Sequence, residues 1–181
     1  MKYKYLLLLV RLLQKKIFLG NRLILNSFRI GFEERIKIII KGSNSLIHLK
    51  KNIYLMRNGN LEVYNGGKIS IGENVSINKN FSIVSRKSIT LGNNISIGPN
   101  CCIYDHDHSF EDEKQLIREQ QYKSRPIEIQ DNVWIASNVF IGKGVKVGKG
   151  SIIGSGSVVV KNVEPYTIVG GVPSKLLKNR F

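Results

Sequence analysis

The sequence predicts an all-β solenoid, in which the chain winds into stacked coils of short strands and turns. The main observation is that an aliphatic residue opens each six-residue unit between residues 97 and 163, apart from one interruption. These opening residues are Ile97, Ile103, Ile129, Ile135, Ile141, Val147, Ile153 and Val159. A period of six fits neither the 3.6-residue turn of a helix nor the two-residue alternation of a strand. It is typical of a chain that runs straight and then turns, so that three units make one coil of about eighteen residues.

Two further patterns support the solenoid. The position four residues after an opening aliphatic is usually small or β-branched, as an inward-facing side chain near a corner must be. These positions hold Cys101, Val133, Val139, Val145, Ser151 and Ser157. Gly and Asn gather in the turns, where φ is often positive. The clean register begins at Ile71 and restarts two residues late at Leu91. The corner before Leu91 must be distorted, because Lys87 would otherwise point inward.

Residues 1–35 do not repeat, and we expect an N-terminal helical segment there. Apolar residues lie close to helical spacing with Lys and Arg between them, namely Leu6, Leu9, Val10, Leu13, Ile17 and Leu19. The apolar run Tyr3–Val10 is too short to span a bilayer and lacks the small-residue cleavage site of a signal peptide. An amphipathic helix is expected either to pack on the solenoid or a neighbouring subunit, or to contact a membrane surface through residues 1–20.

The remaining chain divides into a solenoid over residues 36–163 and a C-terminal piece over residues 164–181. Residues 36–68 are β-rich but irregular, and we interpret them as the first coils. Ile103 and Ile129 are 26 residues apart where whole six-residue units would give 24, and the segment between them is highly charged. We therefore expect an extruded loop over residues 109–126. After the coil, Ser174 is suited to N-cap a short helix, Lys175–Asn179.

Charge and cysteine content restrict the partners and the compartment. The net charge is +15, and residues 1–60 hold thirteen Lys or Arg against two Glu, a net of +11. Such a surface favours membrane headgroups, nucleic acid or a phosphorylated small molecule, but no nucleic-acid motif supports the second of these. Cys101 and Cys102 are neighbours in a predicted strand and point to opposite faces, so no disulfide is expected. We expect a cytoplasmic protein, with a peripheral position on the inner membrane face as the alternative.

The interruption of the repeats holds the residues best suited to chemistry. His106 and His108 are one residue apart, and no further Cys, His or carboxylate set at coil spacing completes a metal site, so no metal is expected. Nucleophilic catalysis by Cys102 lacks a visible cause for a lowered thiol pKa. General-base catalysis by one histidine in a cleft is the simplest use of these residues.

The residues around the interruption also resemble those of a known protein family. The segment IGPNCCIYDHDH, the loop, and the segment from PIEIQDNVWIASNVF to GGVPSKLL resemble the hexapeptide-repeat O-acetyltransferases over roughly residues 70–178. That family includes the galactoside, maltose and xenobiotic acetyltransferases and the polysaccharide and sialic-acid O-acetyltransferases. The resemblance implies a left-handed parallel β-helix and a homotrimer with active sites between neighbouring prisms. It also implies acetyl-CoA as donor and a histidine general base that activates the acceptor hydroxyl.

The resemblance assigns roles to particular residues. The family base lies five residues after the opening aliphatic of its unit, which is His108 here, with His106 as the fallback. Asp105 or Asp107 would orient the imidazole or contact substrate. Trp134 matches a tryptophan beside pantetheine and acceptor. The other expected coenzyme contacts are Ala136, Gly142, Gly154, Lys161, Lys175 and Lys178. Val160 replaces the usual Thr before Lys161, which removes one polar contact.

Three functions remain open from the sequence. The first is O-acetylation of a sugar hydroxyl in surface polysaccharide or glycoconjugate biosynthesis, on a saccharide acceptor that is either soluble or lipid-linked. The second is N-acetylation of an amino sugar, because the same base would serve an amine. The third is a non-catalytic basic solenoid that binds a membrane or another anionic surface.

Overall fold

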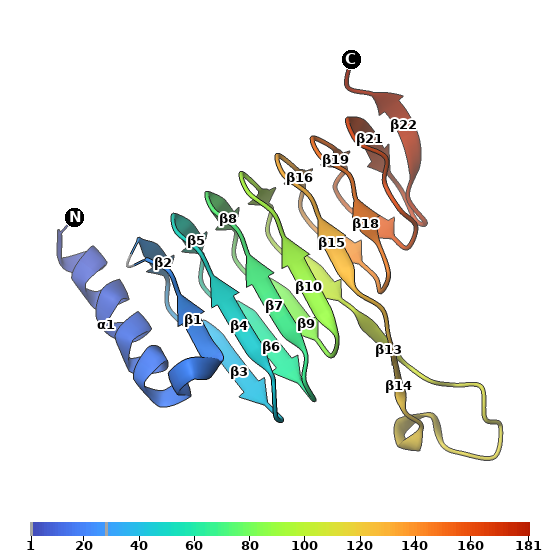
Figure 1. Cartoon of the computed structure of the whole chain (residues 1–181). Helices are drawn as coiled ribbons and strands as arrows, with labels where there is room; N and C mark the ends of the chain where they lie inside the picture. Colours follow the sequence, from blue (N-terminus) through green and yellow to red (C-terminus); the bar gives the residue numbers. More distant parts are fainter. Residues whose placement is uncertain (1, 28) are drawn as a thin grey trace.

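The computed structural model of the chain describes residues 2–27 and 29–181, with side chains from Val10 onward. The chain winds into a solenoid whose coils contribute to three parallel sheets, and helix α1 (Lys2–Leu19) lies at its N-terminal end (Figure 1). Sheet A contains β1 (Leu23–Leu25), β4 (Leu46–Leu49), β7 (Lys68–Ile71), β10 (Ser88–Leu91), β15 (Ile127–Ile129) and β18 (Lys146–Val147). Sheet C contains β3 (Lys37–Lys41), β6 (Asn60–Tyr64), β9 (Ser82–Ser85), β12 (Cys102–Tyr104), β17 (Phe140–Ile141) and β20 (Val158–Val159).

Sheet B carries the two C-terminal strands. Its members are β2 (Ile30–Phe32), β5 (Ile53–Leu55), β8 (Val75–Ile77), β11 (Ser96–Ile97), β16 (Trp134–Ile135), β19 (Ile152–Ile153), β21 (Thr167–Gly170) and β22 (Lys175–Asn179). Two short 3-10 helices, Gly20–Arg22 and Ile117–Glu119, lie outside the sheets. An antiparallel pair, β13 (His106–His108) and β14 (Tyr122–Ser124), projects from the solenoid. The predicted all-β solenoid is confirmed.

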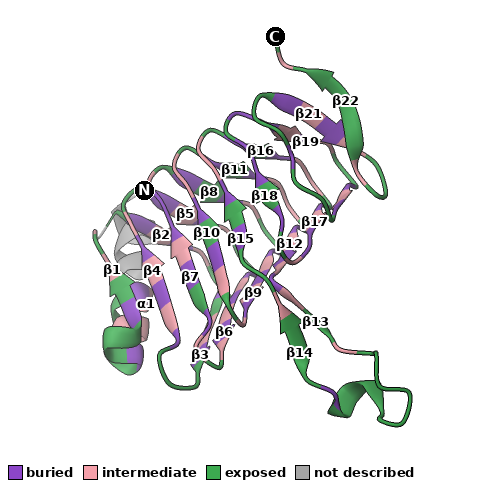
Figure 2. Ribbon diagram, turned by 45° about the vertical axis from the view of Figure 1, so that its right-hand side comes forward, coloured by how far each residue is buried: buried purple, intermediate pink, exposed green. Residues whose placement is uncertain are grey.

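The interior of the prism is filled by the predicted aliphatic positions. Each opening residue packs in register on its copy in the next coil, as Ile97 pairs with Ile135 and Ile135 with Ile153. All eight are buried, and the small residues four positions later are buried beside them. Figure 2 shows buried residues alternating with partly exposed ones along the strands. This alternation follows from strand geometry, because successive side chains point to opposite faces.

The coils shorten along the chain, which explains the irregular pattern before residue 70. Leu49 pairs with Ile71, a spacing of 22 residues, whereas Ile135 pairs with Ile153, a spacing of 18. The solenoid also begins earlier than residue 36, because β1 and β2 already pair with the next coil. The expected boundary at residue 35 is therefore replaced by one near Leu23.

Asparagine side chains stabilise one corner of the stack. Asn58, Asn80, Asn100 and Asn138 form a ladder in which each amide nitrogen donates to the next side-chain oxygen, at 3.2, 2.9 and 2.9 Å. All four have φ of 59 or 60°, as a left-handed corner requires. Asn tolerates this conformation better than other side chains, and the ladder also satisfies its amide groups. The sequence preference for Asn in the turns therefore has two causes.

The C-terminal segment corrects one prediction. Lys175–Asn179 is strand β22 and not a helix, and it pairs antiparallel with β21 after a turn. The last parallel strand of sheet B leaves an edge of unpaired backbone groups, and pairing with β22 satisfies them. Tertiary pairing of this kind overrides a weak local helix signal.

Helix α1 has an inner and an outer apolar side. Leu12 and Leu19 are buried against the first coil, and Lys16 donates to the carbonyls of Gly20 and Leu23 at the end of the helix. Ile17 on the outside is 81% exposed, and Phe18, which borders a cavity between the helix and the first coil, is 85% exposed. A helix that only covers the end of a solenoid normally presents a polar outer side. In the part of the chain that is described, no helix is both long and apolar enough to cross a membrane.

Replacing a stacked core residue should destabilise the fold. Ile135 is fully buried between two coils, and we expect Ile135→Ala to lower the free energy of unfolding by about 2–5 kcal/mol, since a cavity would remain. Thr90→Ala, on the exposed side of β10, should change it by no more than about 0.5 kcal/mol. Guanidinium unfolding of both variants tests this, and equal losses would contradict the assigned facing of the strands.

Candidate active site

The predicted extruded loop is a hairpin arm, residues 106–124, which leaves the corner between sheets C and A (Figure 1). Its two strands pair His106 with Ser124 and His108 with Tyr122. The base of the arm is closed by a hydrogen bond of 2.8 Å from the Arg125 amide to the Asp105 carbonyl. Both histidines therefore lie where the arm joins the solenoid.

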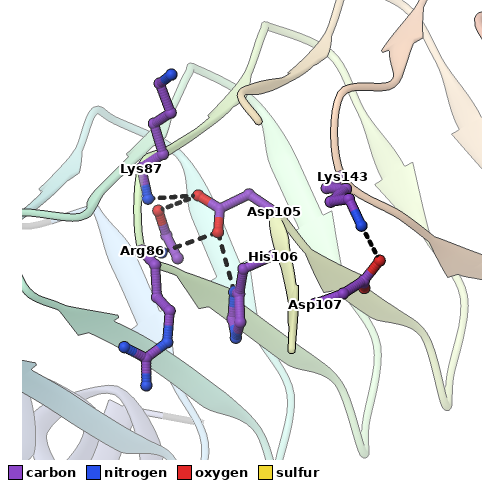
Figure 3. Close-up of polar contacts among 7 residues, drawn as sticks. Arg86, Lys87, Asp105, His106, Asp107 and Lys143 are labelled. Carbon is purple, nitrogen blue, oxygen red and sulfur yellow. Dashed lines mark hydrogen bonds and ion pairs between the residues drawn. The ribbon is translucent and has the colours of Figure 1, made fainter. Parts of the chain in front are cut away.

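Asp105 organises this corner. Its carboxylate is fully buried and accepts hydrogen bonds from the Ser85 hydroxyl at 2.7 Å and from the backbone amides of Arg86 and Lys87, both at 2.8 Å (Figure 3). These amides belong to the corner of the preceding coil, where the repeat restarts late. The predicted distortion is confirmed, since Lys87 is exposed, and the carboxylate satisfies the amides that the distortion leaves unpaired.

The same carboxylate holds His106. The Nδ1 atom of His106 lies 3.0 Å from Asp105 Oδ1, and the His106 side chain is only 13% exposed. Its ring lies between those of Tyr104 and Tyr122, with centroids 6.2 and 5.4 Å away. Asp105 is inaccessible to a substrate and occupies the position of an orienting group.

Hydrogen bonding keeps Asp105 ionised. Burial acts to raise the pKa of Asp105, but the hydrogen bonds from His106, from Ser85 and from the Arg86 and Lys87 amides outweigh it. The pKa lies below its ordinary value of 3.8 as a result. Three of these donors are fixed in the fold, so the carboxylate is a permanent negative charge under His106 near neutral pH.

His108 differs from His106 in its surroundings. It is exposed, and its ring lies 4.3 Å from that of Tyr122, centroid to centroid. Because β13 alternates, Asp107 points to the other side, where it forms an ion pair with Lys143 (Figure 3). Asp107 therefore anchors the arm to the next coil, and His108 is the histidine of the pair that is open to solvent.

The other predicted contacts fall into two groups. Gly142 and Lys161 follow strands of sheet C, on the corner that also carries the arm. Trp134 and Ala136 lie in and just after β16 of sheet B. The remaining members of this second group are Gly154, Lys175 and Lys178. One chain therefore does not bring Trp134 next to the histidines.

Trp134 borders a shallow cavity of about 310 Å³ on sheet B. Trp134 is 54% exposed, as the outward spacing in the sequence predicted. The cavity is also lined by Ser96, Asn132, Ile152 and Arg180, and Arg180 donates to the Gly150 carbonyl at 2.6 Å. Sequence reasoning missed Arg180, because a basic residue at a chain end carries no pattern of its own.

Sequence reasoning also missed an aromatic and cationic cluster beside the histidines. The Arg86 guanidinium carbon lies 3.5 Å from the Tyr122 ring centroid and 5.4 Å from that of Tyr64. The displaced register before Leu91 pointed to this corner but not to its chemistry. Among the described residues, no group of three or more His, Cys, Asp or Glu is placed to hold a metal ion.

Comparisons with known proteins identify the family. The family described as bacterial transferase hexapeptide (six repeats) matches residues 126–161. A hexapeptide-repeat acetyltransferase of Vibrio cholerae O1 biovar eltor, crystallised with acetyl coenzyme A, is 30% identical, with a TM-score of 0.64 over 79% of this chain and 71% of that one. The chain belongs to the hexapeptide-repeat acetyltransferases. It is therefore an acyltransferase, and its solenoid is the left-handed parallel β-helix that the resemblance implied.

Further solved structures that are similar to this chain are also acetyltransferases. A galactoside acetyltransferase in complex with coenzyme A is 29% identical, with a TM-score of 0.65 over 81% of this chain and 66% of that one. A maltose O-acetyltransferase from Clostridium difficile 630 is 27% identical, with a TM-score of 0.58 over 86% and 70%. Curated protein sequences gave no match.

The depressed pKa of Asp105 predicts a pH-dependent stability. A lowered folded-state pKa stabilises the fold above the unfolded value near 3.8, and this contribution is lost as the pH falls through the folded value. We expect Asp105→Asn to lower the free energy of unfolding by about 2–4 kcal/mol at neutral pH, because three or more charge-assisted hydrogen bonds are weakened. At about pH 3 and below, the difference from the wild-type protein should shrink.

Urea unfolding at both pH values measures this effect. The matched control is Asp107→Asn, which removes a half-exposed partner of Lys143 and should cost less than about 1 kcal/mol at either pH. A loss for Asp105→Asn that stays constant with pH would contradict the assigned ionised state.

Proposed function

We propose that this chain transfers the acetyl group of acetyl-CoA to a hydroxyl group of a sugar, in surface polysaccharide or glycoconjugate biosynthesis. The observation that carries the proposal is the division of the histidine pair: His106 is held by a buried carboxylate, and His108 is left open on the same strand face. The galactoside and maltose acetyltransferases among the similar structures support a sugar acceptor, and two similar structures hold coenzyme A or its acetyl form.

His108 is the proposed general base. It takes the proton of the acceptor hydroxyl as the oxygen attacks the thioester carbonyl carbon. The carbon–sulfur bond then breaks, and the imidazolium returns the proton to the departing thiolate, so that the products are an acetyl ester and free coenzyme A. His106 is the fallback for this role. In our assignment it instead positions β13, because its Nδ1 is bound to Asp105.

We propose that the active enzyme is a homotrimer with sites between neighbouring copies. The arm and Trp134 lie on different sides of one prism, so a site that uses both needs a second copy. In this arrangement Trp134, Ala136, Gly142 and Gly154 contact pantetheine, and Lys161, Lys175 and Lys178 neutralise the coenzyme phosphates. The small residues allow a close approach to the backbone.

One other function remains as an outcome of the same assay. N-acetylation of an amino sugar would appear as turnover restricted to amines. The non-catalytic basic solenoid that the sequence left open does not agree with membership of the acetyltransferase family. Use of acetyl-CoA as donor favours a cytoplasmic location, which is also part of the proposal.

We further propose that α1 contacts the inner membrane surface, where a lipid-linked saccharide would be acetylated. Ile17 is exposed on the outer side of the helix, and Phe18 is exposed beside Arg11 and Lys15, where the helix borders the first coil. Apolar side chains that insert between headgroups, with cations that pair with anionic lipids, are the requirements of an interfacial helix.

Replacing the base should abolish transfer without unfolding the protein. We expect His108→Ala to lower kcat for thiol release from acetyl-CoA by about 10²–10⁴-fold with an accepted sugar, because proton removal is then left to water. The thermal midpoint should hardly change, since His108 is exposed. His106→Ala is the comparison variant, and it should lower the thermal midpoint and reduce kcat less. The opposite pattern would assign the base to His106.

Membrane contact can be tested by sedimentation with vesicles of phosphatidylglycerol and phosphatidylcholine. We expect Ile17→Asp to reduce the bound fraction at least several-fold, because a charge on the apolar outer side opposes insertion. Leu116→Asp, the same kind of change on an exposed residue of the arm, should leave binding unchanged. Unchanged binding of Ile17→Asp together with loss of the trimer would instead place the helix between subunits.

A further inference from the structure

Arg86 stands beside both histidines without an acidic partner of its own. Tyr122 contacts both His108 and Arg86, with the His108 ring 4.3 Å and the Arg86 guanidinium carbon 3.5 Å from its centroid. Tyr122 therefore links Arg86 to the proposed base. The Arg86 backbone amide is fixed by Asp105, so the side chain starts from a rigid point.

Among the described residues, none accepts a hydrogen bond from the Arg86 side chain. Its Nε is buried and donates to no protein group, and no carboxylate among the described residues lies within salt-bridge distance of its guanidinium. The guanidinium carbon lies over the Tyr122 ring, and this contact uses none of the N–H groups. Because Nε is buried, the terminal N–H groups are the ones available to a ligand, and they match the two oxygens of a carboxylate or phosphate.

None of the nearby carboxylates in the described chain occupies the Arg86 guanidinium. The nearby acidic groups already have partners: Asp105 accepts four hydrogen bonds, Asp107 pairs with Lys143, and Glu111 pairs with Lys123. Glu62, on the other side of Tyr64, accepts from that hydroxyl at 2.7 Å. This bond and burial raise the pKa of Tyr64 to about 12, so Tyr64 adds no negative charge.

We propose that Arg86 binds an anionic group of the acceptor saccharide, a carboxylate or a phosphate, and so selects acidic saccharides over neutral ones. This inference rests on the proposed function, since it names the acceptor class of that site. His108 would deprotonate a hydroxyl on the same sugar or on its neighbour. The acceptor classes that fit are uronic or other acidic sugars and glycans that carry phosphodiesters.

A purely structural role for Arg86 makes a different prediction. If stacking on Tyr122 only held the arm in place, losing Arg86 would impair acidic and neutral acceptors alike. Selection of an anion impairs the acidic acceptors alone. The two roles are therefore separated by acceptor pairs that differ in one charge.

The test uses methyl glucuronide and N-acetylneuraminic acid, each against its uncharged methyl ester, and a sugar phosphodiester against the unphosphorylated sugar. Thiol release from acetyl-CoA measures turnover, and ligand-observed NMR measures binding without turnover. We expect the wild-type protein to bind at least one acid form ten-fold or more tightly than its neutral partner. Carboxylate and phosphate acceptors are distinguished by which pair shows the preference.

Arg86→Gln should abolish that preference. We expect kcat/KM for the preferred acid to fall ten-fold or more, while the value for its neutral partner and KM for acetyl-CoA change less than three-fold. Lys87→Gln is the matched control, because it removes an equal charge from the neighbouring exposed residue and should change the preference less than three-fold. Arg86→Lys, which keeps the charge and loses the planar fork, should give an intermediate result and covers the case in which Arg86→Gln does not fold.

Two outcomes would overturn the inference. One is a wild-type protein that binds no acid form more tightly than its neutral partner. The other is an equal loss for acidic and neutral acceptors in the Arg86 variants. Failure of the proposed function itself looks different: anion binding would persist and depend on Arg86, but no acceptor would release thiol from acetyl-CoA.

Discussion

One buried carboxylate joins the three parts on which the candidate site depends. Asp105 satisfies two backbone amides of the preceding corner, holds the ring of His106, and begins the arm through its own backbone. A buried charge is costly unless it is fully hydrogen-bonded, and here the partners are the preceding corner, residues 85–87, and the ring of His106. The corner, the histidine strand and the base of the arm are therefore fixed together, so the position of His108 depends on a residue that is inaccessible to substrate.

The solenoid frame was readable from the sequence because it repeats. Each inward position, such as Ile135 or Ser157, has the same surroundings in every coil. The same residue pattern therefore recurs many times, and one atypical residue does not hide it. The N-terminal coils were harder to delimit because their spacing is longer, and the helix predicted at Lys175–Asn179 was wrong because an unpaired sheet edge determined that segment.

The site was readable only in part. The interruption located the arm and both histidines, since a charged insertion in an apolar repeat is visible in the sequence. The roles of the neighbours were not visible, because they arise between coils: Ser85 and Arg86 are about 20 residues from Asp105, with no motif to link them. The groups that face Trp134 in the enzyme cannot be identified from one chain. Trp134 and the rest of the second group of predicted contacts are on sheet B, away from the arm.

The closed base of the arm has an evolutionary consequence. The chain leaves the solenoid at Asp105 and returns at Arg125, and a backbone hydrogen bond joins these two residues. The alignment of the coils therefore does not depend on the number of residues in the arm. The entropy cost of lengthening such a closed segment grows only slowly. Insertions, deletions or wholesale exchange of the tip can therefore accumulate while the coils keep their alignment.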